Sequence, residues 1–484
     1  MSAIRFLLGE DECALRDVPP TLTVLEYLRR QARRTGTKEG CAEGDCGACT
    51  VVLAEPDGAG GLRHWAVNAC IQFVPALHGR QLLTVEDVKH ADGTLHPVQQ
   101  ALVDHHGSQC GFCTPGFVMQ LYAGWLESTL KDRQSVKDWL AGNLCRCTGY
   151  GPIIDAGLDV AAAPGPAAAA QAVTARRLAA LDDGDMLHIG HGDQEWFAPR
   201  SIDELAEVYS KHPDAVLVAG ATDVGLWVTK QQRHLATLID VTRVAGLNEI
   251  KQSADGLSIG ATVSHREATA ALGRLHPDLG ELFRRFASIQ IRNAGTVGGN
   301  IANASPIGDL APALIALGAT LRLRRGAARR ELPLEAFFLA YGKQDRAPGE
   351  FVEALQVPRV GEATRFACYK ISRRFDQDIS AVMGAFAVTL KGNTVVRARV
   401  AYGGIAATSK RAEKTEATLT GQPFEATTIE RACSALTDDF TPITDMRAST
   451  NYRLLVAQNL LRRFHLENSG EKVATRVLEL VDDE

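Results

Sequence analysis

Eight of the eleven cysteines in this 484-residue chain are gathered in two clusters, and this clustering limits what the chain can fold into. The first cluster consists of Cys41, Cys46, Cys49 and Cys70, and the second of Cys110, Cys113, Cys145 and Cys147. In a reducing compartment, clustered cysteines are more often metal ligands than disulfides, and four thiolates select a soft metal. The sequence therefore predicts two sulfur-ligated metal centres. We interpret the isolated Cys13, Cys368 and Cys433 as buried small apolar residues.

The first cluster reads TKEGCAEGDCGACTV, with the spacing C-x4-C-x2-C followed by a distant fourth cysteine. This spacing is the plant-type ferredoxin arrangement for a 2Fe–2S centre. Gly40, Gly44 and Gly47 lie among the ligands, where a chain that wraps closely around a cluster needs an unobstructed backbone. Structural zinc is the alternative, but zinc usually takes two paired arms, whereas three ligands share one loop here. The spacing favours iron and sulfide.

The second cluster consists of two cysteine pairs beside predicted helices. GSQCGFCTPG holds the first pair, between the helical patterns HPVQQALVDHHG and FVMQLYAGWLESTL, and Pro115 and Gly116 open the second of these helices. SVKDWLAGNL leads to the second pair, in GNLCRCTGY. Two ligand pairs delivered from helix ends indicate a helical bundle that closes over a metal. Zinc is an alternative here too, but the neighbouring ferredoxin motif favours a second iron–sulfur centre, because two centres in series form an electron relay.

The composition changes after Tyr150, in the segment AAAPGPAAAAQAV. We interpret it as a domain linker, because Pro164 and Pro166 cannot sit inside a helix and the remaining residues have little to bury. A helix in part of the alanine run is the alternative. Further on, PRSIDELAEVYSKHP predicts a helix with Ser201 as its N-cap and Glu204 three residues later.

A glycine-rich string, IRNAGTVGGNIANASPIGDLAPAL, is the most unusual part of the second half. Backbone N–H groups in such a string can approach an anion such as a pyrophosphate. A crossing point between strands would have the same composition, so the string by itself leaves both interpretations open. No G-x-G-x-x-G follows a predicted strand, so a Rossmann nucleotide site is not supported.

Charge and hydropathy exclude several partners. The chain has 52 basic and 57 acidic residues, so it has no basic excess that would attract nucleic acid. No apolar run reaches the ~18 residues that a membrane-spanning helix needs. The start, MSAIRFLLGEDECAL, soon meets three acidic residues and does not read as a signal peptide. We expect a cytoplasmic chain that binds neither membrane nor nucleic acid.

The cysteine motifs GCAEGDCGACTV, QCGFCTPGF and GNLCRCTGY resemble the paired 2Fe–2S domains of the molybdenum hydroxylases. The resemblance implies that all eight clustered cysteines are cluster ligands and that the chain has an α+β multidomain fold. The implied parts are a β-grasp 2Fe–2S ferredoxin domain (1–86), a four-helix-bundle 2Fe–2S domain (87–160), an Ala/Pro linker (161–190), a vanillyl-alcohol-oxidase-type FAD domain (191–358) and a small α+β C-terminal domain (359–475).

Two further strings, LVAGATDV and TVGGNIANASPIGD, are similar to the FAD-binding segments of the same family. The resemblance implies that the first lines the adenine and pyrophosphate and that the second holds the pyrophosphate and ribitol. Phe286 matches an aromatic residue beside the adenine, Lys370 a flavin-contacting lysine and Val352 a backbone contact. The implied FAD residues are Leu217, Val218, Ala219, Gly220, Ala221, Thr222, Asp223, Val224, Phe286, Thr296, Val297, Gly298, Gly299, Asn300, Asp309, Val352 and Lys370. The family often has Thr or Gly at the position of Asn303.

The loop SRRFDQDIS places two opposite charge pairs within a few residues. Most such runs are solvated turns. In the resembling dehydrogenases this loop lies near the flavin and influences the access of NAD, which gives a hypothesis for Asp376 and Asp378. We expect no catalytic residue on this chain for the hydroxylation itself.

The resemblance implies an electron-transfer subunit with two 2Fe–2S clusters and FAD, NAD as co-substrate, and molybdopterin only on a large partner chain. Within the family, the chain resembles the small subunit of bacterial xanthine dehydrogenases, which implies a heterotetramer of two small and two large chains. The reaction of that assembly would be hypoxanthine to xanthine and xanthine to urate. The same role in an aldehyde or N-heterocycle hydroxylase is the alternative, and a zinc-stapled scaffold without redox chemistry is a third interpretation.

Overall fold

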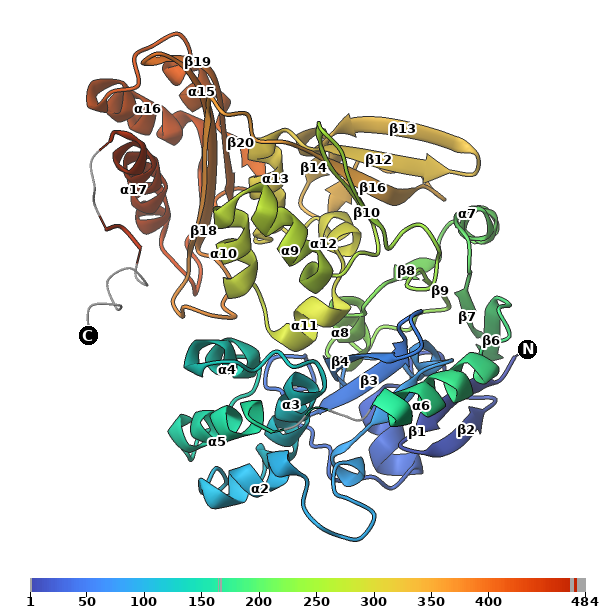
Figure 1. Cartoon of the computed structure of the whole chain (residues 1–484). Helices are drawn as coiled ribbons and strands as arrows, with labels where there is room; N and C mark the ends of the chain where they lie inside the picture. Colours follow the sequence, from blue (N-terminus) through green and yellow to red (C-terminus); the bar gives the residue numbers. More distant parts are fainter. Residues whose placement is uncertain (1, 164, 166–167, 471–473, 477–484) are drawn as a thin grey trace. The chain divides into compact units, whose positions relative to one another are not determined.

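The computed structural model describes residues 2–163, 165, 168–470 and 474–476 (Figure 1). The chain divides into two compact units, each made of segments that are not contiguous in the sequence. The first comprises Met1–Leu247, Ser264–Arg266 and Ala287–Thr296, and the second Asn248–Val263, Glu267–Phe286 and Val297–Glu484.

The first unit begins with a five-stranded sheet in the order β2-β1-β5-β3-β4, in which β1 and β5 are parallel. Its strands are β1 (Ile4–Leu8), β2 (Asp11–Leu15), β3 (Thr50–Pro56), β4 (Leu62–Asn68) and β5 (Gln81–Leu83). Helix α1 (Val24–Glu26) and the π-helical turn η1 (Tyr27–Gln31) contribute Val24 and Leu28 to the core under the sheet. This arrangement confirms the predicted β-grasp domain.

Strand β3 is buried on both faces. Successive side chains of a strand point to opposite sides, and those of β3 enter two different cores. Val51 and Leu53 belong to the core under the sheet, whereas Val52 packs into a second core with Phe117 and Leu121 of α3. Strand β3 therefore contributes both to the core of the sheet and to the core of the helices that follow.

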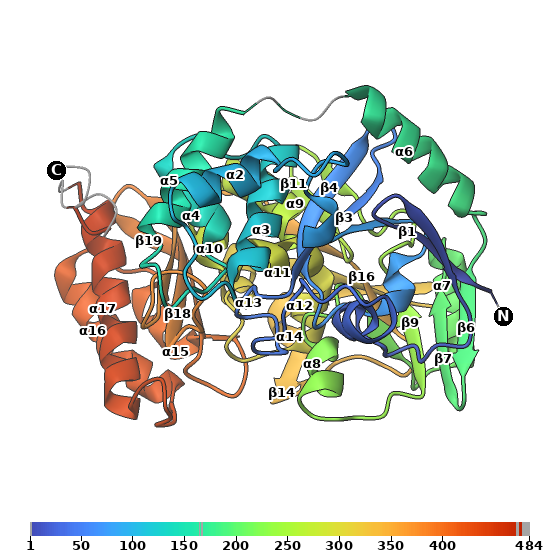
Figure 2. The ribbon, with the colours of Figure 1, turned by 90° about the horizontal axis from the view of Figure 1, so that it is seen from below.

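Four helices build the second core and confirm the predicted bundle (Figure 2). They are α2 (Pro97–Asp104), α3 (Thr114–Leu126), α4 (Arg133–Leu140) and α5 (Gly151–Ala161). Pro115 lies in the first turn of α3, as predicted, and Cys113 is its N-cap residue. Asp132 caps α4 by accepting the N–H of Ser135 at 2.7 Å.

Helix α6 (Ala168–Leu181) lies within residues 161–190, which we interpreted as a domain linker. Alanine has the highest helix propensity, and Leu178 and Leu181 gain further stability by packing with Leu7 of β1. The alternative of a helix in the alanine run was the correct one. Pro164 and Pro166 lie outside the described residues.

A four-stranded sheet completes the first unit, in the order β6-β7-β9-β8. Its strands are β6 (Leu187–His191), β7 (Gln194–Ala198), β8 (Val216–Val218) and β9 (Thr237–Asp240), and its helices are α7 (Ile202–Lys211), α8 (Val224–Thr229) and α11 (Ile289–Ala294). Ser201 accepts the N–H of Glu204 at 3.1 Å, which confirms the predicted N-cap of α7.

The second unit holds a five-stranded antiparallel sheet in the order β10-β11-β16-β12-β13, whose core includes Ile259, Leu321 and Leu355. Its strands are β10 (Ile250–Gln252), β11 (Gly256–Gly260), β12 (Thr320–Arg325), β13 (Ala328–Pro333) and β16 (Phe351–Pro358), and β14 (Phe338–Ala340) pairs with β15 (Lys343–Gln344). Its helices are α9 (His265–Leu275), α10 (Pro277–Arg285), α12 (Val297–Asn303), α13 (Leu310–Leu317) and α14 (Leu334–Phe337).

A four-stranded antiparallel sheet, β17-β18-β19-β20, and three helices form the C-terminal part. The strands are β17 (Thr364–Ile371), β18 (Val382–Lys391), β19 (Thr394–Gly403) and β20 (Lys410–Arg411), and the helices are α15 (Glu413–Leu419), α16 (Ala426–Asp439) and α17 (Thr450–Asn468). Phe386 of β18 stacks on Phe464 of α17, with ring centroids 5.2 Å apart, and meets Tyr402 edge-on. The fold class predicted from the sequence is thus confirmed.

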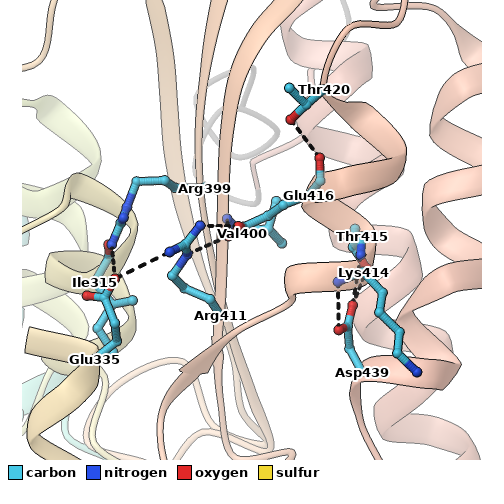
Figure 3. A network of polar contacts seen from close by, with 10 residues as sticks. All are labelled: Ile315, Glu335, Arg399, Val400, Arg411, Lys414, Thr415, Glu416, Thr420 and Asp439. Atoms are coloured by element: carbon cyan, nitrogen blue, oxygen red, sulfur yellow. Dashed lines mark hydrogen bonds and ion pairs between the residues drawn. The ribbon is translucent and has the colours of Figure 1, made fainter. Parts of the chain in front are cut away.

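Ion pairs connect this C-terminal part to the preceding helices of the same unit (Figure 3). Arg399 of β19 donates to the carbonyl of Ile315 at 2.6 Å and to Glu335 at 2.7 Å. Arg411 pairs with both Glu335 and Glu416. Because Glu335 follows the buried Leu334 at the start of α14, the network attaches α13 and α14 to the edge of the C-terminal sheet.

We predict that Phe386→Ala lowers the free energy of unfolding of the second unit by about 3–5 kcal/mol, because it opens a cavity among three aromatic rings. Chemical denaturation followed by circular dichroism measures this change. Val396→Ala is the control: its side chain is 47% exposed on the neighbouring strand, so we expect a change within about 0.5 kcal/mol. Equal losses in the two variants would contradict the assigned core.

Candidate functional site

The four cysteines of the first cluster lie together in the first unit. Cys41, Cys46 and Cys49 are in the loop that leads into β3, and Cys70 follows β4. The thiol of Cys41 shares hydrogen bonds with Cys46 and Cys70, and these lower its pKa. Cys70 shares a further hydrogen bond with Cys49, and both of these residues are buried.

The four cysteines of the second cluster also lie together in the first unit, but two of them are exposed to solvent. Cys110 and Cys113 precede α3, and the other pair lies in the loop between α4 and α5. Cys113 shares a hydrogen bond with Cys145, and burial together with this bond raises its pKa to about 12. Cys110 shares a hydrogen bond with Cys147, and both of these residues are exposed. The structure thus brings together each predicted foursome.

The spacing of the sulfur atoms discriminates between a zinc ion and a two-iron cluster. A zinc ion with bonds of ~2.3 Å in a tetrahedron places its four sulfurs about 3.8 Å from one another. In the part of the chain that the structure describes, no three cysteine sulfurs lie within 4.8 Å of one another. In the first foursome Cys41 contacts both Cys46 and Cys70, whereas the second foursome consists of two pairs, and neither forms the compact foursome that a single zinc ion requires.

Two glycines of the first loop are required by close approach. A Cβ atom at Gly40 would lie 2.8 Å from the sulfur of Cys46. Gly47 has a φ of +69°, and a Cβ atom there would lie 2.4 Å from the carbonyl oxygen of Gly142. The predicted need for an unobstructed backbone is met at both positions.

The two cysteine loops contact each other directly. The N–H of Leu144 donates to the carbonyl of Cys46 at 3.0 Å, and the side-chain amide of Asn143 donates to the carbonyl of Gly47 at 3.0 Å. Leu144 immediately precedes Cys145. The backbone of Cys46, a predicted ligand of the first cluster, is therefore bonded to the neighbour of Cys145, a predicted ligand of the second. The sequence analysis missed this contact.

The first flavin-like segment runs from β8 through a buried turn into α8. A Cβ atom at Gly220 would lie 1.7 Å from the carbonyl oxygen of Ala294, so only glycine fits at this position. Ala221 adopts a left-handed φ of 57°. Gln72, two residues beyond Cys70, donates its side-chain amide to the carbonyl of Gly220 at 2.8 Å. The turn is thus anchored to the loop of the first cysteine cluster, and the sequence analysis missed Gln72.

The glycine-rich string contains a packing element in the second unit. The N–H groups of Val297 and Gly298, at the start of α12, donate to the carbonyls of Val263 and Ala261 at 2.9 Å each. A Cβ atom at Gly298 would lie 2.6 Å from Ala261. Both N–H groups are bound to protein carbonyls, so Gly298 has a packing role, and its role in binding FAD stays a prediction. Gly299, which is exposed, and Asn300 follow in the same turn.

Asp309 and Lys370, both predicted to bind flavin, meet each other in the second unit. The Nζ atom of Lys370 lies 2.6 Å from Oδ2 of Asp309, and both side chains are buried. The hydroxyl of Ser380 donates to the other Asp309 oxygen at 2.5 Å and accepts from Lys370 at 2.9 Å. Ser380 was missed by the sequence analysis. Elsewhere, Val352 of β16 pairs with Leu323 of β12.

The loop after β17 is built around Asp378. Its carboxylate accepts the N–H groups of Arg373 at 2.8 Å and Arg374 at 3.0 Å. Partial burial raises the pKa of Asp378, but these N–H groups outweigh burial and lower it. Arg285 of α10 contacts the loop at Phe375. It donates to the carbonyl of Phe375 at 3.1 Å, and its guanidinium carbon lies 4.4 Å from the centre of the phenyl ring of Phe375. The charge-paired turn is confirmed, while the proposed effect on NAD stays a prediction.

Comparison with protein families assigns the same parts of the chain. Residues 10–74 match a 2Fe–2S iron–sulfur cluster binding domain, and residues 84–158 match a [2Fe–2S] binding domain. Residues 191–360 match the FAD binding domain in molybdopterin dehydrogenase, and residues 367–468 match the CO dehydrogenase flavoprotein C-terminal domain. The chain therefore contains two 2Fe–2S domains, an FAD-binding domain and a flavoprotein C-terminal domain.

Several known proteins are similar to the chain. The xanthine dehydrogenase of Emericella nidulans is 33% identical over 90% of this chain, and the chain spans 36% of that protein. In the structural comparison, the carbon monoxide dehydrogenase of Hydrogenophaga pseudoflava is 28% identical with a TM-score of 0.53, and quinoline 2-oxidoreductase of Pseudomonas putida 86 is 27% identical with a TM-score of 0.51. Each covers 56% of this chain, which in turn covers 96% and 94% of those chains. Over the described residues, no helix has the length and apolar character that a membrane span requires.

We predict that Ser380→Ala lowers the free energy of unfolding of the second unit by about 1–3 kcal/mol, because an oxygen of buried Asp309 loses its donor. Denaturant unfolding measures this change. Ser434→Ala, on the exposed side of α16, removes a hydroxyl bonded only within its own helix and is expected to change stability by less than about 0.5 kcal/mol. A neutral Ser380→Ala would contradict the buried network.

Proposed function

Because its four domains fit the iron–sulfur and FAD part of a molybdenum hydroxylase, we propose that this chain carries electrons from a molybdenum centre on a partner chain to FAD and then to NAD. The observation that carries this proposal is the pairing of two closed cysteine foursomes whose loops are bonded to each other. A zinc-stapled scaffold would not need the matched FAD domain.

The proposed ligands follow the sequence prediction. Cys41, Cys46, Cys49 and Cys70 hold one 2Fe–2S cluster, and Cys110, Cys113, Cys145 and Cys147 hold the other. The FAD residues are those that the resemblance implies, from Leu217 to Lys370. When bound, a 2Fe–2S cluster exchanges single electrons and FAD exchanges two, so together they connect a two-electron oxidation with a two-electron acceptor.

The contacts of the chain suggest the order in which these sites act. Cys110 and Cys147 are exposed, so the second foursome is the one that a partner chain can approach. The bond from Leu144 to Cys46 leads from there to the first foursome. The bond from Gln72 to Gly220 leads from the first foursome to the first flavin-like segment. Electrons would enter at the helical domain and leave through the ferredoxin domain.

The buried pair of Lys370 and Asp309 defines the electrostatics near the proposed flavin site. A buried ammonium group without a partner would be very costly, and Asp309 compensates its charge at 2.6 Å. We infer that Lys370 offers the cofactor a hydrogen-bond donor without adding a full positive charge. Asp376 and Asp378, on the loop that follows β17, are the proposed determinants of NAD access.

For the substrate, we propose the oxidation of hypoxanthine to xanthine and of xanthine to urate, as in a xanthine dehydrogenase. This rests on the relatives of that name. We place molybdopterin and the substrate pocket on a large partner chain, in a heterotetramer of two small and two large chains, and the similarity to a chain of carbon monoxide dehydrogenase supports this arrangement. Oxidation of an N-heterocycle is the second candidate, favoured by the similarity to quinoline 2-oxidoreductase, and an aldehyde is a third.

We expect Cys49→Ser and Cys113→Ser each to remove about half of the iron and sulfide from the purified chain, because each variant opens one of two separate clusters. Elemental analysis and visible absorption measure the loss. The control is Cys13→Ser in the ferredoxin domain. The thiol of Cys13 accepts a hydrogen bond from the hydroxyl of Tyr27 and is not a proposed ligand, so this variant should leave the iron content unchanged. Full iron in both ligand variants, or zinc in the unaltered chain, would overturn the assignment.

The acceptor requires a separate test. Anaerobic NADH is expected to bleach the flavin and iron–sulfur absorption of the unaltered chain, and Asp376→Ala or Asp378→Ala is expected to slow this bleaching by altering the loop beside the proposed site. Dithionite serves as the control reductant, since its reaction does not depend on an NAD site. Bleaching by dithionite but not by NADH would exclude NAD while leaving the cofactors in place.

A further inference from the structure

Gln290 is a polar side chain from the FAD-binding domain that lies buried beside both cysteine loops. It follows Ser288, the N-cap of α11, and stands between Ile289 and Ile291. Its exposed fraction is 0%, although its amide carries two donors and an acceptor. Burial of an amide is costly unless its hydrogen bonds are made, so the partners of its two N–H donors indicate what it does. Its Oε1 atom is buried without a hydrogen-bond partner among the described residues.

The partners of Gln290 come from both cluster domains. Its Nε2 atom donates to the hydroxyl of Thr50 at 3.1 Å and to Oδ1 of Asn143 at 2.8 Å. Thr50 immediately follows Cys49, and Asn143 lies two residues before Cys145. One amide group thus uses both of its donors to join the first cysteine loop to the second.

Asn143 forms further hydrogen bonds between the two cysteine loops. Its own amide nitrogen donates to the carbonyl of Gly47 at 3.0 Å and approaches the Thr50 hydroxyl at 3.3 Å. The Thr50 hydroxyl donates in turn to the carbonyl of Gly47 at 2.6 Å. Every side chain of this network is at most 2% exposed, so water does not compete for its bonds.

The fit around Gln290 is also steric. A Cβ atom added at Gly142 would lie 2.1 Å from Oε1 of Gln290 and 2.7 Å from Cβ of Ser288. Gly142 has no positive φ, so its substitution by alanine would act through this contact alone. The second cysteine loop therefore approaches Gln290 so closely that a single methyl group would displace it.

We propose that Gln290 is a positioning residue that sets the separation and relative orientation of the two iron–sulfur clusters. This inference rests on the proposed cysteine ligands. Among the described residues, the hydrogen bonds of the Gln290 side chain go to Thr50 and Asn143, the neighbours of Cys49 and Cys145, and Gln290 acts through these two residues. A segment of the FAD-binding domain thereby controls the step between the two clusters.

The test uses the full chain, reduced with dithionite, and low-temperature electron paramagnetic resonance. Two reduced clusters at short distance split each other's signals, and the dipolar part of this splitting falls with the cube of their separation. Gln290→Met keeps the length of the side chain but removes its donors, and Gly142→Ala keeps Gln290 but displaces it. We expect a resolved splitting in the unaltered chain and its loss in both variants.

Gln120→Met is the matched control. Gln120 is also 0% exposed, and its side-chain amide donates to the backbone carbonyl of Trp139 at 2.8 Å, which lies in α4 and not in a cysteine loop. Its substitution should reduce stability by a comparable amount and leave the splitting unchanged. An equal loss of splitting in Gln120→Met would make the effect merely structural and overturn the proposal.

The iron content separates the two possible failures. If both clusters are present and the splitting is unchanged in Gln290→Met and Gly142→Ala, the inference about Gln290 is wrong while the proposed function stands. Absence of splitting in an unaltered chain that shows both cluster signals would also overturn it. If the unaltered chain contains no iron–sulfur cluster, the proposed function itself fails.

Discussion

The contact between the two cysteine loops is the constraint on which the rest of the first unit depends. The carbonyl of Gly47 would lie 2.3 Å from a Cβ atom at Gly116, and that of Gly142 would lie 2.4 Å from a Cβ atom at Gly47. A side chain at Gly116 would force apart the loop before β3 and the first turn of α3, and a side chain at Gly47 would force the same loop away from the segment after α4. Because the loops touch, β3 has cores on both faces and the two cluster domains pack as one body. Electron transfer between clusters needs this same proximity.

Local patterns in the sequence predicted most elements of the fold, because their causes are local. Pro115 at the start of α3 and Ser201 at the cap of α7 act within one turn of helix, and the spacing of Cys41, Cys46 and Cys49 follows from one loop. The junction at Gln290 was missed because its bonds cross 147 and 240 positions of the sequence. The helix in the predicted linker could not be predicted with certainty, since Leu178 packs against a strand near the N-terminus of the chain.

In the flavin-like segments, a glycine can be required either by close packing of the backbone or by the binding of a cofactor. Gly220 and Gly298 both avoid a clash with backbone, with Ala294 and Ala261 respectively, so packing alone requires them. The resemblance predicted a binding role for the same positions, and a close backbone approach is compatible with both. Asp309 and Lys370 were predicted as separate contacts, and the structure adds that they neutralise each other. No local pattern indicates this pairing, because it joins the N-terminus of α13 to β17.

The central claim is that one chain holds two 2Fe–2S clusters and FAD in electronic contact, and a stepwise anaerobic reductive titration of the purified chain tests it most directly. Optical absorption and electron paramagnetic resonance are recorded at each step, together with iron, sulfide and flavin content. We expect two distinct reduced-cluster signals and one flavin per chain, with electrons that redistribute among them after each addition. A colourless, folded chain that contains zinc and no flavin would contradict the account.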